Sequence, residues 1–536
     1  MTNKRPTQFG KAGIFGTLAM GLVTLFMLIP IGVIVATWFA PIDAVWSHIL
    51  DYLLPTALKN TLLLMLLVTI GAGTLGTYLA WLISMYEFRG RQFFTWALML
   101  PMAIPAYVLA FVSVGFIEFT GPLQTTLRAI GVQATIGSIR NVWVAGVVLS
   151  LVFYPYVYLL ARQAFLTQGR RAIEAGQMLG LSRRQAFFKV ALPQARPWIV
   201  GGMVIAGMET LADFGAVSVF NVETLTTAIY KVWFGLYQLN AAAQLASLLI
   251  LLVMVGVMAE QYWQGKRRFV GNAGRHERFL LAFWQGRFAT LVCGGVFVLA
   301  FLLPMIQLVW WSAMHWQADF DSRYWGYVKN TLTIASITTV LLAALAVIVA
   351  WLKRQFATRG HLALVSLANL GYAVPGTVLA VGVLIPIAWL DNQLIHHGVF
   401  DKPVLSGSVV IMILALLTRF FAVSFQPIDR QLQRLTPSQH EASLLLTDSR
   451  WQRWRLLVLP VLRSGVLMAL LMGFVEVMKE MPITLMTRRN GWDTLAVRVF
   501  EMTSEGMWSR AALPSLLIVI VGLVPVWWLI RQSDKN

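Results

Sequence analysis

Two pairs of carboxylates lie in segments that are otherwise strongly apolar. "GMETLADFGAVSVF" contains Glu209 and Asp213, and "FVEVMKEMPITLM" contains Glu476 and Glu480, four residues apart in each pair. Residues at this spacing share one face of a helix. A carboxylate in an apolar span costs free energy unless it meets a partner or a polar cavity, so it is a candidate functional group. Because carboxylate oxygens suit hard cations, we predict that the four acids contact a metal cation transiently and repel anions.

The same carboxylates could instead be structural. Lys479 lies three residues after Glu476, and Arg488 and Arg489 follow the second pair closely. The first pair has only Lys231 nearby in the sequence, so local ion pairing explains it less well. A cation passage and structural ion pairing therefore both stay open as interpretations.

The composition is that of an integral membrane protein. The 536 residues are 58% hydrophobic and only 12% charged, with a mean hydropathy of +0.71. An apolar run of about 18 residues or more can cross a bilayer as a helix. We therefore predict an all-α polytopic protein with about twelve transmembrane helices. The predicted spans are 14–36, 58–84, 93–118, 141–161, 198–222, 242–259, 288–312, 330–352, 362–388, 408–425, 465–487 and 512–531.

The net charge of +19 is an orientation signal. With the N-terminus inside, most of the 42 Lys and Arg residues fall in the inner loops and at the termini. This positive-inside bias predicts a bacterial inner-membrane protein with both termini in the cytoplasm. The bias also explains the positive charge without a nucleic-acid partner, so we predict none. The predicted surrounding of the chain is the lipid bilayer.

The chain carries an internal duplication. Lys59-Asn60-Thr61 returns as Lys329-Asn330-Thr331, and Pro105 returns as Pro375, in each case 270 residues later. An even number of spans in each copy makes the copies parallel. The predicted halves and linker are 1–265, 288–536 and the basic segment 266–287. Two classes have this plan: secondary transporters of the major-facilitator type, driven by an ion gradient, and fused permeases of ABC importers.

The inner loops separate these classes. "EAGQMLGLSRRQAFFKVALP" begins at Glu174 and "EASLLLTDSRWQRWRLLVLP" begins at Glu441, with the same Glu-to-Pro spacing, in loops of about 162–197 and 426–464. One copy alone could be an interfacial amphipathic helix. Both copies together resemble the EAA loop of bacterial ABC importer permeases. The residues that carry the resemblance are Glu174, Ala175, Gly176, Gly180, Leu181, Pro193, Glu441, Ala442, Ser443, Thr447, Asp448 and Pro460.

The resemblance implies a type I ABC importer permease in which each loop forms two short helices that dock on a cytoplasmic ATPase. No G-x-x-x-x-G-K-[ST] motif occurs in the sequence, so we expect no catalytic residue and no bound cofactor in this chain. Two copies of a partner ATPase would use ATP and Mg²⁺. Thr447 stands where the pattern has Gly, so the two docking sites need not be equivalent.

The acidic segments are similar to those of fused ferric-iron permeases. The similar stretches are "METLADFGAVSVFNVETLTTAIY" and "EVMKEMPITLMTRRNGWDTLAVRVFE". This resemblance implies transport of Fe(III), delivered by a periplasmic iron-binding protein and moved by alternating access. Thiamine or a polyamine is the alternative cargo.

Two smaller features concern helix geometry. Pro105 and Pro375 could kink the third span of each half near a gate, or be ordinary kinks that neighbouring groups satisfy. "GAGTLG" at 71–76 predicts close helix packing and not a phosphate-binding loop.

Overall fold

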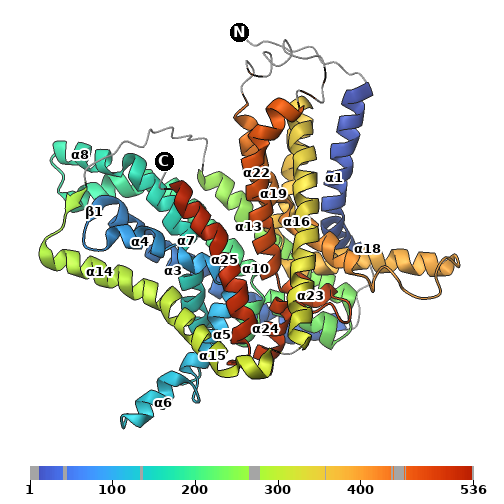
Figure 1. Cartoon of the computed structure of the whole chain (residues 1–536), viewed down its shortest axis with the longest axis horizontal. Helices are drawn as coiled ribbons and strands as arrows, with labels where there is room; N and C mark the ends of the chain where they lie inside the picture. Colours follow the sequence, from blue (N-terminus) through green and yellow to red (C-terminus); the bar gives the residue numbers. More distant parts are fainter. Residues whose placement is uncertain are drawn as a thin grey trace. The chain divides into compact units, whose positions relative to one another are not determined.

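The computed structural model describes residues 11–39, 45–132, 137–264, 278–320, 322–356, 358–435, 439, 449, 452 and 454–533 (Figure 1). Helices dominate, and the predicted all-α polytopic class is confirmed. The strands found in the described part are β1 (Tyr86–Glu87) and β2 (Phe279–Leu280), which pair in parallel over two residues each.

The chain divides into two compact units. Unit 1 comprises Met1–Pro41 and Arg323–Val497, and unit 2 comprises Ile42–Ser322 and Arg498–Asn536. These packing units and the predicted contiguous halves have different boundaries. In unit 1, helix α1 (Lys11–Ala36), from the start of the chain, packs against α17 and α18 of the second sequence repeat. In unit 2, α15 and α25 of the second repeat pack together, and α15 contacts α5 of the first repeat.

The elements of unit 1 follow α1 in chain order. They are η1 (Thr37–Phe39), α16 (Ser322–Phe356), α17 (Arg359–Ala368), η8 (Asn369–Ala373), α18 (Gly376–His396), α19 (Val409–Gln433), η9 (Trp454–Val458), α22 (Leu459–Lys479), α23 (Pro482–Thr487) and the start of α24 (Leu495–Ser504). Residue Ser322 at the start of α16, and the end of α24, belong to unit 2.

Unit 2 contains the remaining elements. The first group is α2 (Val45–His48), η2 (Ile49–Leu53), α3 (Leu54–Met85), α4 (Arg91–Ala97), η3 (Leu100–Ala103), α5 (Ala106–Ile117), α6 (Pro122–Ala129) and α7 (Val142–Ala164). Next come η4 (Phe165–Gly169), α8 (Arg170–Met178), α9 (Arg183–Ala186), η5 (Phe187–Ala191), α10 (Leu192–Ala212), α11 (Gly215–Val219), α12 (Leu225–Tyr230), η6 (Lys231–Gly235) and α13 (Leu239–Gln264). The last are α14 (Phe283–Phe297), η7 (Val298–Leu302), α15 (Leu303–Asp319) and α25 (Ala512–Ser533).

Ten helical segments in the described part of the chain are long and apolar enough to cross a membrane. They account for ten of the predicted spans. The predicted span 512–531 corresponds to α25, whose apolar stretch Ala512–Trp528 is shorter. The predicted span 198–222 corresponds to α10, which ends at Ala212. The early end of α10 concerns the candidate site directly.

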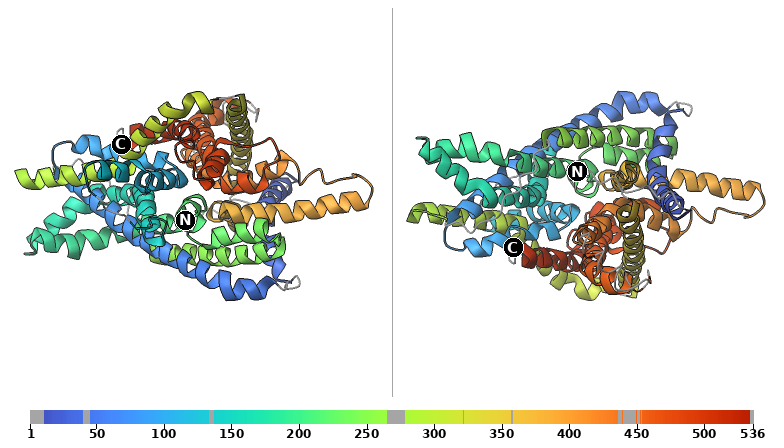
Figure 2. Two further views of the ribbon diagram at one scale, coloured as in Figure 1. Left: turned by 90° about the horizontal axis from the view of Figure 1, so that it is seen from below. Right: turned by 90° about the horizontal axis from the view of Figure 1, so that it is seen from above.

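Close contact between α3 and α7 forms the centre of unit 2. The two helices lie side by side in Figures 1 and 2, and α10 packs against both. A Cβ atom on Gly76 would lie 2.7 Å from the backbone oxygen of Tyr154, and one on Gly202 would lie 2.6 Å from the Cα of Val157. Glycines therefore allow the backbones to approach, and the close-packing interpretation of "GAGTLG" is confirmed.

Pro105 and Pro375 end one helical segment and begin the next. Both have nearly the same backbone angles, with φ −58° and ψ 146° at Pro105 and φ −57° and ψ 147° at Pro375. The preceding residues, Ile104 and Val374, are extended, as expected before proline. The predicted kink is therefore a complete break, because the residue before each proline leaves the helical conformation.

Candidate functional site

The two predicted acidic pairs do not each lie on one continuous helix. Helix α10 ends at Ala212, and Asp213 is extended with ψ 131°. Helix α22 ends at Lys479, and Glu480 is extended with ψ 124°. The prediction that the pairs share a helix face is therefore wrong. The second acid of each pair lies at a break, where a long helix gives way to a short one.

The carboxylates at these breaks satisfy backbone N–H groups of the next short helix. Asp213 Oδ1 accepts a hydrogen bond from the Val217 N–H at 3.1 Å. Glu480 Oε1 accepts from the Ile483 N–H at 3.0 Å, and its Oε2 accepts from the Thr484 N–H at 3.2 Å. The first N–H groups of a helix have no partner within the helix, and a carboxylate there also suits the helix dipole. Both units thus use the same device at equivalent positions.

Glu480 also has a basic neighbour that the sequence analysis missed. Its side chain is buried, with 6% exposed, and it lies near Arg419 of α19. A Cβ atom on Gly376 would lie 2.6 Å from both Glu480 Oε1 and Arg419 Nη1, so a larger residue there would force these side chains to move. The sequence did contain a signal for Arg419, because a single arginine within an apolar run is typically a functional or paired group in a membrane helix. Arg419 offsets the charge of Glu480, which favours a structural contribution at this position.

Glu209 and Glu476 remain within their helices, one turn before each break, and both are half-buried. Two of the four bases considered as local partners pair with other acids. Lys231 pairs with Glu223, and Arg488 pairs with Asp493 at 2.5 Å.

Among the described residues, no three His, Cys, Asp or Glu side chains converge as a stable metal site requires. The role of the four acids as transient metal contacts stays a prediction.

The duplicated Lys-Asn-Thr motif holds the segment that follows each break. Thr61 Oγ1 accepts a hydrogen bond from the Leu225 N–H, and Thr331 Oγ1 accepts from the Leu495 N–H, both at 2.9 Å. The sequence separation is 164 residues in both cases. The preceding asparagine of each motif donates to the carbonyl two residues before that leucine, at 2.9 Å and 3.1 Å. A repeated motif therefore makes repeated contacts.

The first EAA-like loop forms two short helices joined by a glycine turn. Glu174, Ala175 and Gly176 lie in α8, and Gly180 has φ +82°, a left-handed conformation that favours glycine. The Leu181 N–H donates to the Gly176 carbonyl at 3.0 Å and closes the turn.

Helix α9 then begins with a reciprocal cap. Gln185 N–H donates to Ser182 Oγ, and the Ser182 N–H donates to Gln185 Oε1. Pro193 lies in the first turn of α10.

Small residues bring the two short helices together. A Cβ atom on Gly176 would lie 2.8 Å from the Cβ of Ala186. At the end of α8, Met178 is 88% exposed and Leu179 is 82% exposed. Large apolar side chains exposed at the tip of a turn are suited to insertion into a partner protein.

Much of the second EAA-like loop lies outside the described residues. This applies to Glu441, Ala442, Ser443, Thr447 and Asp448. Pro460 is described, and it lies in the first turn of α22 as Pro193 does in α10.

Comparison with known proteins matches this arrangement to a transport family. Residues 72–270 match the family described as the binding-protein-dependent transport system inner membrane component. The sulfate transport system permease protein CysW of Escherichia coli is 30% identical over 40% of this chain and 72% of its own length. The chain belongs to this family. It is therefore a multi-pass inner-membrane component with a role in transport.

Two further relatives extend over more of the chain. The Fe(3+)-transport system permease protein FbpB 2 of Haemophilus influenzae is 26% identical over 89% of this chain and 90% of its own length. The ferric transport system permease protein FbpB of Actinobacillus pleuropneumoniae is 23% identical over 72% of this chain and 58% of its own length. The family thus includes proteins named for a cation and for an anion, and membership alone does not select the cargo.

Replacing Thr61 with Val should weaken the contact between α3 and the start of α12. Valine keeps the side-chain shape but leaves the buried Leu225 N–H without its acceptor, which costs about 1–3 kcal/mol. We expect a lower apparent free energy of unfolding in detergent micelles. Thr74→Val is the matched control, because the Thr74 hydroxyl bonds only to carbonyls of its own helix. Equal stability of the two variants would contradict this role.

Proposed function

We propose that this chain is the membrane permease of an ABC importer for ferric iron. The observation that carries the proposal is the match to the FbpB 2 relative along 89% of the chain, which includes both sequence repeats. The sulfate permease relatives CysT and CysW match only 38% and 40% of the chain. A match over both repeats is the stronger guide to cargo, because the passage of a fused permease is built from both.

The proposed partners follow from the family description and the coupling geometry. A periplasmic binding protein delivers the iron to the outer loops, and two copies of a cytoplasmic ATPase use ATP and Mg²⁺. The EAA-like loops and both termini face the cytoplasm in this proposal. The exposed Met178 and Leu179 at the α8–α9 turn insert into the ATPase and transmit its closure to α10 through the closely packed Gly176.

In the proposed passage, the acidic residues have two different tasks. Asp213 and Glu480 hold the helix breaks by capping, and their negative charge adds to the potential along the passage. Glu209 and Glu476 make up the rest of that potential, one helical turn before each break. A negative potential raises the local concentration of a cation and excludes anions.

Uptake of radioactive ferric iron into cells that lack this protein tests the cargo and the acids together. Wild type should restore ATP-dependent uptake. A variant with all four acids changed to their amides should take up iron at least about tenfold more slowly, because the amides remove the charge while each keeps one acceptor oxygen. The substitutions are Glu209→Gln, Asp213→Asn, Glu476→Gln and Glu480→Gln.

The control carries Asp51→Asn and Glu505→Gln, two exposed acids away from the helix breaks, at matched membrane levels. Full uptake by the four-amide variant would show that the acids are structural. If wild type failed to restore iron uptake, ferric iron would be excluded as the cargo. Thiamine and a polyamine would be the next cargoes to test.

Leu179→Asp tests the coupling to an ATPase. Placing a charge in an apolar docking site should abolish co-purification of the ATPase with this chain, because an unpaired buried charge is strongly unfavourable. Tyr237→Asp is the matched control, since Tyr237 is 86% exposed in the same unit but distant from the loop in sequence. Transport that follows an ion gradient, with no ATPase bound to wild type, would instead support a secondary transporter.

A further inference from the structure

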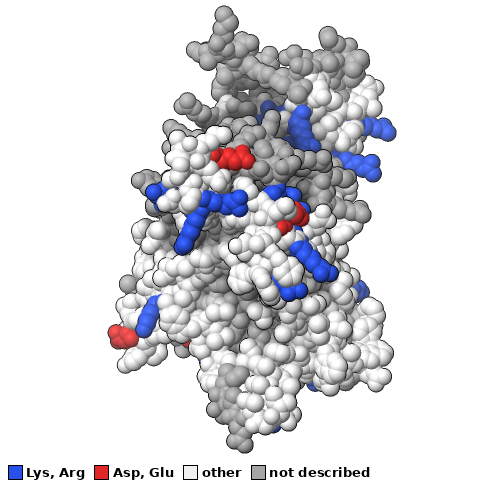
Figure 3. Space-filling view, turned by 90° about the vertical axis from the view of Figure 1, so that its left-hand side faces the viewer, with Lys and Arg blue, Asp and Glu red and all other residues white. Residues whose placement is uncertain are grey.

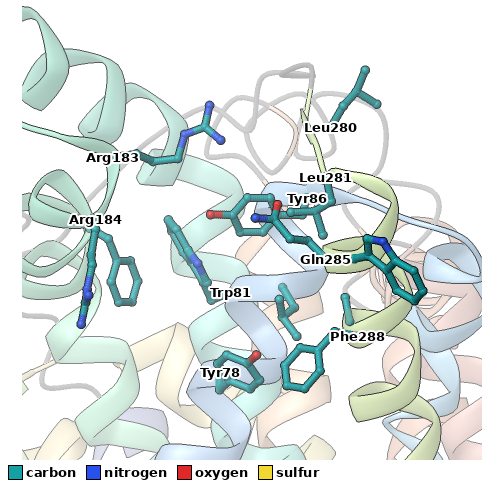
Figure 4. A pocket seen from close by; sticks show the side chains of 13 residues that line it. Tyr78, Trp81, Tyr86, Arg183, Arg184, Leu280, Leu281, Gln285 and Phe288 are labelled. Atoms are coloured by element: carbon teal, nitrogen blue, oxygen red, sulfur yellow. The ribbon is translucent and has the colours of Figure 1, made fainter.

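An open groove in unit 2 lies beside the α8–α9 turn. Its volume is about 680 Å³, and Figure 4 shows how side chains from three parts of the unit surround it. Helix α3 contributes its last turns, α9 and η5 contribute two arginines and a phenylalanine, and β2 and α14 close the other side. The lining residues are Tyr78, Trp81, Leu82, Tyr86, Arg183, Arg184, Phe187, Leu280, Leu281, Trp284, Gln285, Phe288 and Ala289.

The groove has a basic end and an apolar end. Figure 4 shows Arg183 and Leu280 at one end and Tyr78 and Phe288 at the other. The apolar end follows the helices into the candidate membrane spans Val45–Met85 and Phe283–Gln317. Tyr78 lies seven residues before the end of α3, about 10 Å along the helix axis. The groove therefore extends from the membrane surface toward the hydrocarbon region.

The apolar end is open to the surroundings of the protein. Phe288 is 59% exposed, Leu291 on the next turn of α14 is 72% exposed, and Tyr78 is 42% exposed. Near the basic end, Trp284 is 74% exposed. Tryptophan and tyrosine at the ends of spans are typical of the membrane–water interface. This distribution matches the polarity profile of one leaflet.

The basic end carries positive charge that the described residues do not neutralise. At this end, the Arg183 guanidinium stacks over the Phe279 ring at 4.0 Å. Arg184, which Figure 4 shows lower on the same wall and pointing away from Arg183, makes no ion pair with any described residue. The nearby carboxylate of Glu87 is already shared by Arg91 at 2.9 Å and Arg278 at 3.7 Å. Figure 3 views the side of Figure 1 that carries α8 and the start of α14, and it shows more blue than red.

The pKa of Arg278 is lowered, first by burial and then by neighbouring positive charges. These charges belong to Arg91 and Arg162, whereas Glu87 acts in the opposite direction. An anion entering this region would therefore be stabilised.

We propose that this groove binds one anionic phospholipid, with the phosphate headgroup at Arg183, the positive charge of Arg184 on the same wall, and an acyl chain along Tyr78 and Phe288. Charge complementarity selects the headgroup, and the exposed apolar end at membrane depth selects a lipid over a free phosphate. Arginine suits phosphate because its planar guanidinium donates two parallel hydrogen bonds.

The position of the groove also suggests what the lipid does, and this part rests on the proposed function. Arg183 and Arg184 begin α9, three residues after the Gly180 turn that we assign to ATPase docking. The opposite wall is β2 and α14, where the chain re-enters the membrane after the linker. A bound lipid would connect the docking turn to this second segment and hold the docking turn at a fixed height above the membrane.

Native mass spectrometry of the detergent-purified full chain tests the proposal. The probes are phosphatidylglycerol, phosphatidylcholine and inorganic phosphate, titrated against wild type and Arg183→Gln/Arg184→Gln. We expect wild type to hold one phosphatidylglycerol more tightly than phosphatidylcholine. The double variant should bind it about thirtyfold more weakly, as expected for two basic groups near an anionic lipid.

Two further variants keep the test independent of folding and of the transport assignment. Arg183→Lys/Arg184→Lys retains the charge and should bind with most of the wild-type affinity. Arg430→Gln/Arg463→Gln removes two exposed arginines of unit 1 and should bind as wild type does. Equal phosphatidylglycerol binding by wild type and the Arg183→Gln/Arg184→Gln variant would overturn the proposal. Displacement of the lipid by millimolar inorganic phosphate would also overturn it in favour of a free-phosphate site. Because lipid binding is measured without ATPase or iron, failure of the transport assignment would leave this result unaffected.

Discussion

The backbone groups exposed at helix breaks constrain this structure more than any other feature. Each membrane segment that stops and restarts leaves N–H groups without partners, and an apolar environment offers no water to replace them. Asp213 and Glu480 supply the missing acceptors by side-chain capping, and Thr61 and Thr331 supply them at the next segment. The breaks can therefore exist within otherwise apolar packing. In the function proposed above, the passage for the cation forms at these short polar breaks.

This constraint connects the acidic residues to the α8–α9 turn. Helix α10 follows α9 and η5, which come directly after the α8–α9 turn, and it ends at the Asp213 break. Gly73 lets α3 approach α10, Gly202 lets α10 approach α7, and Gly76 lets α3 approach α7. Interfaces packed in this way move as units, because small voids are costly. A continuous helix between the α8–α9 turn and a polar break suits the function proposed above.

Sequence reasoning predicted the helical class, the duplication and the glycine-mediated packing, because hydrophobic runs, repeated motifs and small residues are local signals. It was wrong about Asp213 and Glu480, since an i, i+4 spacing implies a shared face only if the helix continues. It also missed Arg419, whose importance depends on Gly376 and Glu480, far away in the sequence. The packing of α1 with the second repeat could not be predicted, because apolar helices carry little information about which neighbour they choose.

Amide hydrogen exchange at Val217 tests the capping account most directly. Asp213→Asn and Asp213→Ala would be compared with wild type in detergent micelles, and the exchange of the peptide containing Val217 would be followed. Loss of a cap costs about 1 kcal/mol, so the alanine variant should exchange about fivefold faster. The asparagine variant should stay close to wild type, because its amide oxygen still accepts the hydrogen bond. Equal protection in all three proteins, or equal loss in both variants, would contradict the account.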